Sequence, residues 1–130
     1  MTLKQVFMIN SDLKMLKGKI AVQVAHGEVI YMEHIIQTII DYIRYKNQCE
    51  DQIERYDLWR NRENRLMKKI VVKASEHNII EKLSNIKEIW YHRIYDRGLT
   101  QILENSLTCI VFEPLPEKEC DELFGDLKLL

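Results

Sequence analysis

The chain has 130 residues, of which 46% are hydrophobic and 30% charged, and its formal net charge is −1. This composition is typical of one soluble globular domain and excludes a disordered, fibrous or two-domain protein. Residues 1–75 hold 13 Lys and Arg against 9 Asp and Glu (+4), whereas residues 76–130 hold 6 against 11 (−5). The asymmetry is compatible with a local phosphate-binding face, and also with ordinary charged helix surfaces.

Targeting and cysteine signals are weak. No run approaches the ~20 apolar residues that a membrane-spanning helix needs, and the N-terminal residues lack the apolar core of a signal peptide. We therefore expect an intracellular, cytoplasmic protein that does not associate with membranes. The three cysteines are widely spaced and odd in number. A disulfide scaffold, a zinc ribbon or another metal site is therefore not expected.

The first half of the chain predicts a strand, a long helix and a charged segment. Residues 4–10 form a short β-prone run. Over residues 19–45, apolar side chains recur at spacings of three and four, which predicts an amphipathic helix with a continuous apolar seam. Residues 46–67 are highly charged and form either a second helix or a partly mobile segment. The seam consists of Val22, Ala25, Val29, Met32, Ile36, Ile39 and Ile43.

The second half alternates strands and helices. Strands are predicted over 68–74, 89–95 and 107–113, with a loop at 96–106. Helices are predicted over 76–87, after Ser75 as the N-cap, and over 117–124, before Gly125. The order of elements predicts an α/β fold: a single-domain sandwich over residues 1–130, with a mixed four-stranded β-sheet flanked by α-helices.

Two short polar stretches are candidates for a functional site. In the first, Lys14, Lys17 and Lys19 surround the start of the long helix, where the helix dipole favours phosphates and oxyanions. Gln23 and His26 follow Lys19 on one helix face. The alternative is that the lysines are simply solvated and that His26 is an ordinary, partly buried histidine.

The second stretch, Asp96 to Gln101, directly follows a predicted strand. The Asp96 carboxylate could orient a water or act as a base, and Thr100 and Gln101 could donate hydrogen bonds to a substrate oxygen. The alternative is an Asx-type turn, in which Asp96 accepts a hydrogen bond from its own loop.

Four motifs together identify a family. They are SDLKMLKGKIAVQVAHG at 11–27, KKIVVK at 68–73, DRGLTQI at 96–102 and EPLPEKECDELFGDLKLL at 113–130. In order and spacing they resemble the peptidyl-tRNA hydrolase type 2 family, the archaeal and eukaryotic kind. The resemblance covers nearly the whole chain outside residues 44–67.

The resemblance implies hydrolysis of the ester between a peptide and the terminal ribose of tRNA, which recycles stalled peptidyl-tRNA. It implies tRNA as the partner, a homodimer, and no cofactor. It assigns catalysis to Lys19, Asp96 and Thr100. Substrate-binding positions implied by the same motifs are Lys17, Gln23, His26, Lys73 and Gln101.

Several residues depart from the usual family pattern. Asn10 stands where Arg is usual, Leu16 replaces a small residue, and Arg97 replaces the Ala of D-A-G. Phe112 and Glu113 replace a Gly-containing pair. These departures keep a second hypothesis open, in which a catalytically weakened member acts as a tRNA-end or protein-binding module, with Glu113, Arg97 and the charged 46–67 segment as its surface.

Overall fold

A computed structural model describes residues 2–61, 63–96 and 105–130 of the chain. The predicted α/β class is confirmed, and most predicted elements agree with the observed ones to within three residues. The elements are, in chain order, β1 (Leu3–Asn10), the 3₁₀ helix η1 (Ser11–Leu13), α1 (Lys17–Tyr45), α2 (Glu50–Arg60), β2 (Lys69–Ala74), α3 (Glu76–Ser84), β3 (Tyr91–Asp96), β4 (Ser106–Phe112), β5 (Leu115–Pro116), α4 (Glu117–Phe124) and β6 (Lys128–Leu129).

The sheet is mixed, with the strand order β3-β4-β1-β2-β6 and with β5 paired to β1 beside that path. β1 and β2 are parallel, β4 is antiparallel to β1, and β3 is antiparallel to β4. Consequently β1, β2 and β3 all run in the same direction. The sheet has six strands among the described residues where four were predicted. The two extra strands, β5 and β6, have two residues each and are too short to show an alternating pattern.

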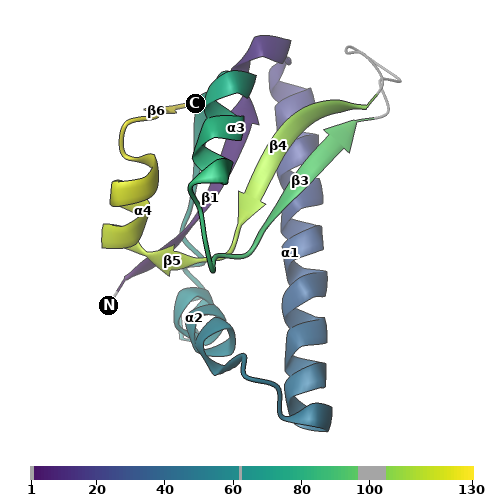
Figure 1. The fold of residues 1–130 in the computed structure, drawn as a ribbon, viewed down its shortest axis with the longest axis vertical. Coiled ribbons are helices and arrows are strands. Elements are labelled where there is room, and N and C mark those ends of the chain that lie inside the picture. The colour runs from purple at the N-terminus through teal and green to yellow at the C-terminus, as the bar shows by residue number, and fades with distance from the viewer. Residues whose placement is uncertain (1, 62, 97–104) are drawn as a thin grey trace.

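Helices cover both faces of this sheet, α1 and α2 on one side and α3 and α4 on the other (Figure 1). The central strand β1 is buried on both faces because its side chains alternate between the two layers. Phe7 and Ile9 pack in the α1 layer, whereas Val6 and Met8 pack in the α3 layer. No helix in the described ranges combines the length and apolar character that crossing a bilayer requires.

The charged segment 46–67 contains a helix, α2, rather than being mobile throughout. Its anchor is Trp59, which is buried and donates its indole N–H to the Lys68 carbonyl over 2.9 Å. The Trp59 ring also meets Tyr31 of α1 edge to face, with centroids 5.9 Å apart. Two aromatic side chains therefore hold a helix whose remaining surface is largely charged.

The apolar seam of α1 lies on the outside of the molecule. An amphipathic helix normally turns such a seam to the core, but Val22, Val29, Ile36 and Ile43 are 50%, 57%, 52% and 70% exposed. The buried residues of α1 are instead Gln23, Gly27, Tyr31 and Ile35. Sequence periodicity therefore identified the helix correctly. Tyr31 and Ile35, which widen the apolar face beyond the seam, are the apolar residues that the core buries.

Gly27 explains which face is buried. A Cβ atom at this position would lie 2.9 Å from Ile94 Cδ1, 3.1 Å from Val111 Cβ and 3.2 Å from Phe7 Cε1. These atoms belong to β3, β4 and β1, which are neighbours in the sheet. Because Gly27 has no side chain, the backbone of α1 comes close to the sheet at this point. Glycine permits this approach without displacing a neighbour, and the contact helps to set the rotation of the helix.

Replacing Gly27 by Ala is expected to lower the free energy of unfolding by about 1–2 kcal/mol. The added methyl group overpacks a stiff contact, and this cost exceeds the ~1 kcal/mol that Ala contributes to helix propensity. The matched control is Gly18→Ala in the same helix, where nothing lies within 4 Å of the new Cβ. That variant is expected to be stabilised by up to about 1 kcal/mol. Urea unfolding measures both, and equal effects of the two substitutions would contradict the close approach.

Candidate functional site

The carboxyl ends of β1, β2 and β3 lie at the edge of the sheet where α1 begins (Figure 1). Ligands of open α/β sheets bind preferentially in such places. Asp96 is the last residue of β3, and Lys19 lies in the first turn of α1. The Lys19 ammonium Nζ lies 2.9 Å from Asp96 Oδ1, and the two side chains are only 12% and 15% exposed. The fold thus brings together two residues that are 77 positions apart.

Gln23 holds α1 in the rotation that this ion pair requires. It lies one helical turn after Lys19 on the same face, and it is 2% exposed. The Thr108 hydroxyl of β4 donates to Gln23 Oε1 at 2.7 Å and also lies 3.1 Å from the Ile94 carbonyl. Gln23 therefore ties α1 to β4 and, through Thr108, to β3, the strand that ends at Asp96. The sequence analysis missed Thr108, whose signal is a polar side chain inside an otherwise apolar strand.

The other predicted site residues are more dispersed. His26 is exposed on the side of α1 that carries Lys19. Lys17 is also exposed, but it lies across the helix from Lys19 and lines a different surface. Lys73 is exposed near the end of β2, where it lies opposite Lys128 of β6 in the strand register. Thr100 and Gln101 fall outside the described residues, so their roles stay predictions, as do the binding roles of the others.

Asn10, one of the departures from the family pattern, stabilises the edge at which the site lies. It is 1% exposed. Its amide donates to the Leu107 carbonyl at 2.9 Å, and its Oδ1 accepts from the Asp12 backbone N–H at 3.0 Å. Asp12 in turn accepts from the Glu76 N–H at the start of α3. Asn10 thus joins β4, η1 and α3.

Glu113, the other prominent departure, does not form an exposed surface. It is 3% exposed. Arg55 Nε of α2 donates to its Oε1 at 2.9 Å, and the Trp90 backbone N–H donates to its Oε2 at 2.7 Å. The hypothesis that Glu113 contributes to a new binding surface is therefore wrong. Its charge is matched by Arg55, and the pair fastens α2 to the strand end beside it. Arg97, its predicted companion, lies outside the described residues.

Thiol and metal chemistry find no support in the described part of the chain. Cys109 and Cys120 are buried, and burial raises the pKa of the Cys109 thiol to about 12. A thiol held protonated in this way is a poor nucleophile. In the described part of the chain, no group of three or more His, Cys, Asp and Glu side chains could hold a metal ion.

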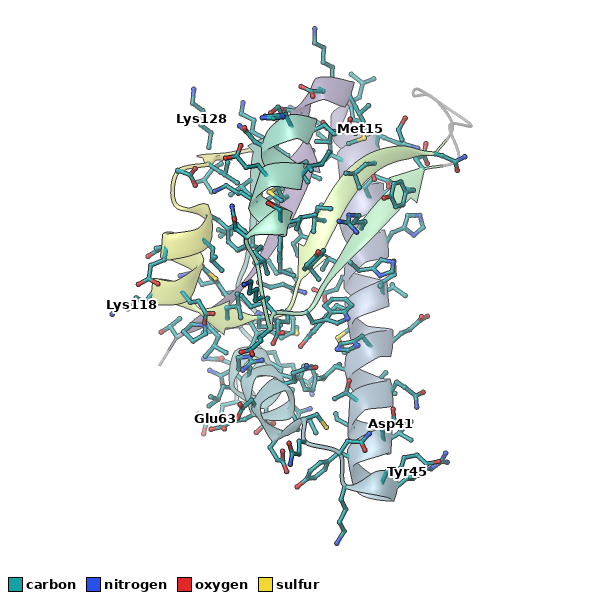
Figure 2. The ribbon with its side chains drawn as sticks, viewed as in Figure 1. Met15, Asp41, Tyr45, Glu63, Lys118 and Lys128 are labelled. Carbon is teal, nitrogen blue, oxygen red and sulfur yellow. The ribbon has the colours of Figure 1, made fainter. Side chains whose placement is uncertain are left out.

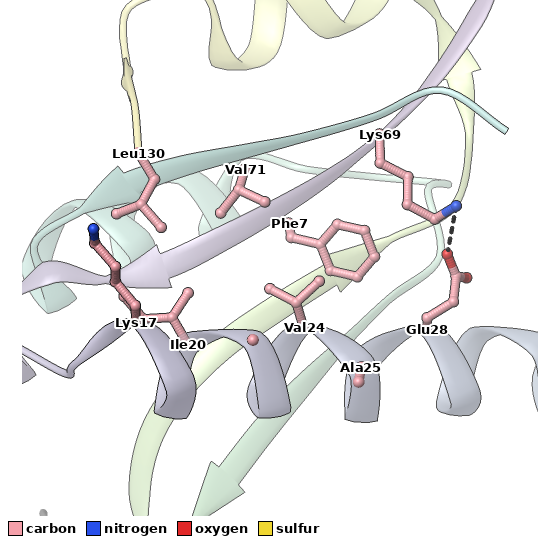
Figure 3. Close-up of a pocket in the computed structure, with 10 residues that line it drawn as sticks. Phe7, Lys17, Ile20, Val24, Ala25, Glu28, Lys69, Val71 and Leu130 are labelled. Carbon is pink, nitrogen blue, oxygen red and sulfur yellow. Dashed lines mark ion pairs between the residues drawn. The ribbon is translucent and has the colours of Figure 1, made fainter. Parts of the chain in front are cut away.

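A largely apolar groove of about 780 Å³ runs along the other side of α1, between that helix, β2 and Leu130 (Figure 3). Phe7 and Val24 form part of its wall, and Lys17 lies at one end. At the opposite end, Lys69 Nζ lies 3.4 Å from Glu28 Oε2. The groove is therefore separated from the Lys19–Asp96 pair by the body of the helix.

Glu28 is an unusual carboxylate in this groove. Neither of its oxygens has a hydrogen-bond partner among the described residues, and the same holds for the buried Gln5 Oε1. Burial raises the pKa of the Glu28 carboxyl above its ordinary 4.5, although Lys69 and Gln5 act in the opposite direction.

Comparison with known proteins identifies the family. The family model described as "Peptidyl-tRNA hydrolase PTH2" matches residues 3–130. A peptidyl-tRNA hydrolase of Staphylothermus marinus is 37% identical over 98% of this chain and 94% of its own length. The enzymes of the same name from Thermococcus sibiricus and Saccharolobus solfataricus are 35% and 34% identical, over 98% of this chain and 97% and 99% of their own lengths. The chain therefore belongs to the peptidyl-tRNA hydrolase PTH2 family, as the motifs indicated.

The raised pKa of Glu28 predicts a pH dependence of stability. Between the ordinary pKa of 4.5 and the higher folded value, the folded state binds more protons than the unfolded chain. The free energy of unfolding therefore falls as the pH rises through this window. Glu28→Gln removes this contribution because the amide stays neutral throughout this pH range.

Urea unfolding between pH 4 and 7 measures the effect as a difference between variants. The control is Glu33→Gln, which removes an exposed carboxylate from the same helix. The variant Glu28→Gln is expected to gain stability over wild type as the pH rises, and Glu33→Gln is not. A constant difference between wild type and Glu28→Gln across this range would contradict the shifted pKa.

Proposed function

We propose that this protein hydrolyses the ester bond that joins a peptide, or an N-blocked amino acid, to the 3′-terminal ribose of tRNA. The observation that carries the proposal is the sheltered Lys19–Asp96 pair at the carboxyl end of β3, with Nζ and Oδ1 2.9 Å apart. The family and the names of its curated members support the same activity. The reaction recycles tRNA from stalled peptidyl-tRNA, which makes the cytoplasm its place of action.

In the proposed mechanism, Asp96 orients a water and accepts its proton as the water oxygen attacks the ester carbonyl carbon. Lys19 stabilises the oxyanion that develops on the carbonyl oxygen, or holds the terminal phosphate. Thr100 positions the water or the carbonyl. The tetrahedral intermediate collapses with the ribose 3′-oxygen as the leaving group. That oxygen takes up a proton, so the products are a peptide carboxylate and a tRNA 3′-hydroxyl.

The sheltered position of the pair is what gives it catalytic value. Fixed charges act more strongly where little water competes with them. The Gln23–Thr108 hydrogen bond and the tight packing at Gly27 hold Lys19 in place before substrate arrives. Such preorganisation suits the hydrolysis of an ester, which needs positioning and charge stabilisation more than a strong nucleophile.

The exposed seam of α1 supports a homodimer as the active form. Val22, Val29, Ile36 and Ile43 follow one another at intervals of seven residues and are exposed. The exposed Ala25 and the half-buried Met32 and Ile39 lie between them. Apolar side chains at alternating spacings of three and four are the pattern by which two helices pack along a common seam. A second copy of this chain presents the same seam, so a two-fold axis would bury both at once.

Single-turnover cleavage of an N-acetylaminoacyl-tRNA tests the active site. Asp96→Asn and Lys19→Ala are each expected to lower the rate by about 10²-fold or more, the scale at which positioned acid–base groups act. The controls are Asp121→Asn and Lys4→Ala, which break another ion pair of similar length, 3.0 Å, between α4 and β1. These controls are expected to keep the wild-type rate. Near-native turnover by Asp96→Asn would overturn the assignment.

Sedimentation tests the dimer. Wild type is expected at twice the 15.6 kDa chain mass, and Ile36→Lys is expected to be a monomer because it places a charge in the middle of the seam. Gln37→Lys adds the same charge at the next, exposed position outside the seam and is expected to stay dimeric. A monomeric wild type at micromolar concentration would refute the proposal.

A further inference from the structure

A run of nearly parallel rings leads along β3 toward Asp96. His34 of α1 stacks on Trp90, with ring centroids 4.4 Å apart and 13° between the planes. Trp90 is followed by His92, whose ring lies 6.3 Å away at 18°. His92 is exposed, whereas His34 and Trp90 are partly buried. His34 and Trp90 are therefore the anchored part of the run, and His92 is its accessible end. None of the three rings has a role in the proposed chemistry.

The anchored rings are held in place by hydrogen bonds and by packing. His34 Nε2 lies 3.1 Å from Gln52 Oε1 of α2. The Trp90 backbone donates to Glu113, and its ring lies 5.7 Å from that of Tyr31. The orientation of Trp90, and with it the environment of His92, is thus set before any ligand binds.

The position of His92 relative to the proposed active site follows from the strand. Alternation along β3 places His92 and Ile94 on one face, and Ile94 packs in the α1 layer. The pairing with β4 shifts register between Ile94 and Tyr95, but Asp96 faces the same layer because it meets Lys19 of α1. Four residues at ~3.3 Å each put His92 about 13 Å from Asp96. This span equals about four stacked nucleotides at 3.4 Å per nucleotide. β3 is also the edge strand of the sheet, so no other described strand pairs with its outer side.

We propose that His92, backed by Trp90 and His34, is a stacking platform for a base of the single-stranded 3′ end of the tRNA. Proteins bind unpaired RNA bases by stacking them on aromatic and histidine rings. When the ester lies at Asp96, the peptide extends from it on one side and the RNA on the other. The RNA part would follow the outer edge of β3 toward His92. This assignment rests on the proposed ester hydrolysis and adds a binding subsite to it.

Kinetics on two substrates of different length test the platform. One is an N-acetylaminoacyl ester of a tetranucleotide with the tRNA 3′-end sequence, and the other is the same ester of adenosine alone. His92→Ala is expected to raise KM about tenfold for the longer substrate, with kcat unchanged, and to leave the adenosine ester unaffected. His92→Phe is expected to restore KM because it retains a ring. The control His77→Ala removes an exposed histidine from α3 and is expected to change neither substrate.

Equal losses on both substrates would overturn the proposal, because they would place His92 in the peptide site or in the support of Asp96. Unchanged kinetics on both would also overturn it. Failure of the platform is distinguished from failure of the proposed function by measuring how tightly the deacylated tetranucleotide binds. Fluorescence anisotropy at fixed salt gives this affinity. If wild type hydrolyses neither ester, tighter binding by wild type than by His92→Ala still supports the platform, and equal binding refutes it.

Discussion

The close approach of α1 to the sheet at Gly27 is the constraint on which the site depends. With no side chain at this point, the helix backbone lies against Ile94, Val111 and Phe7. The Gln23–Thr108 hydrogen bond then prevents the helix from rotating about that contact. Because the rotation is fixed, Lys19, one turn earlier on the same face, meets Asp96 at the end of β3. A helix held only by a wide apolar stripe would leave this ion pair far less well defined.

The same constraint divides α1 between different tasks. One face carries Lys19, Gln23 and the ring of His34 toward β3 and β4. Figure 2 shows side chains along the length of α1, as far as Tyr45 at its end. The opposite side borders the apolar groove and carries the exposed seam. Four large apolar side chains exposed along one helix support the homodimer proposed above. The helix thus carries the proposed active site on one side and the proposed dimer surface on the other.

The residues that depart from the family pattern act chiefly through the fold. Asn10 joins three elements around the edge that carries the site. Glu113 is buried with Arg55, and its second oxygen receives the Trp90 N–H. A lone buried carboxylate would be costly, so Glu113 and Arg55 are best understood as a pair. Through Trp90 this pair also orients the rings of the proposed platform, which links a departure from the family pattern to the proposed binding of substrate.

The sequence by itself determined the family, the α/β class and the order of the longer elements, because these depend on local patterns and on motif spacing. It also proposed Lys19 and Asp96 as site residues, and the fold brings these two side chains together. It identified the amphipathic α1 but not which part of its apolar face is buried, since periodicity alone does not say which apolar residues meet the core. The two-residue strands β5 and β6 escaped detection because their pairing partners alone define them. Only the tertiary structure could decide the contacts between distant segments, such as Gln23 with Thr108, Arg55 with Glu113, and the rings of His34, Trp90 and His92, because residues far apart in the chain have no spacing that predicts their meeting.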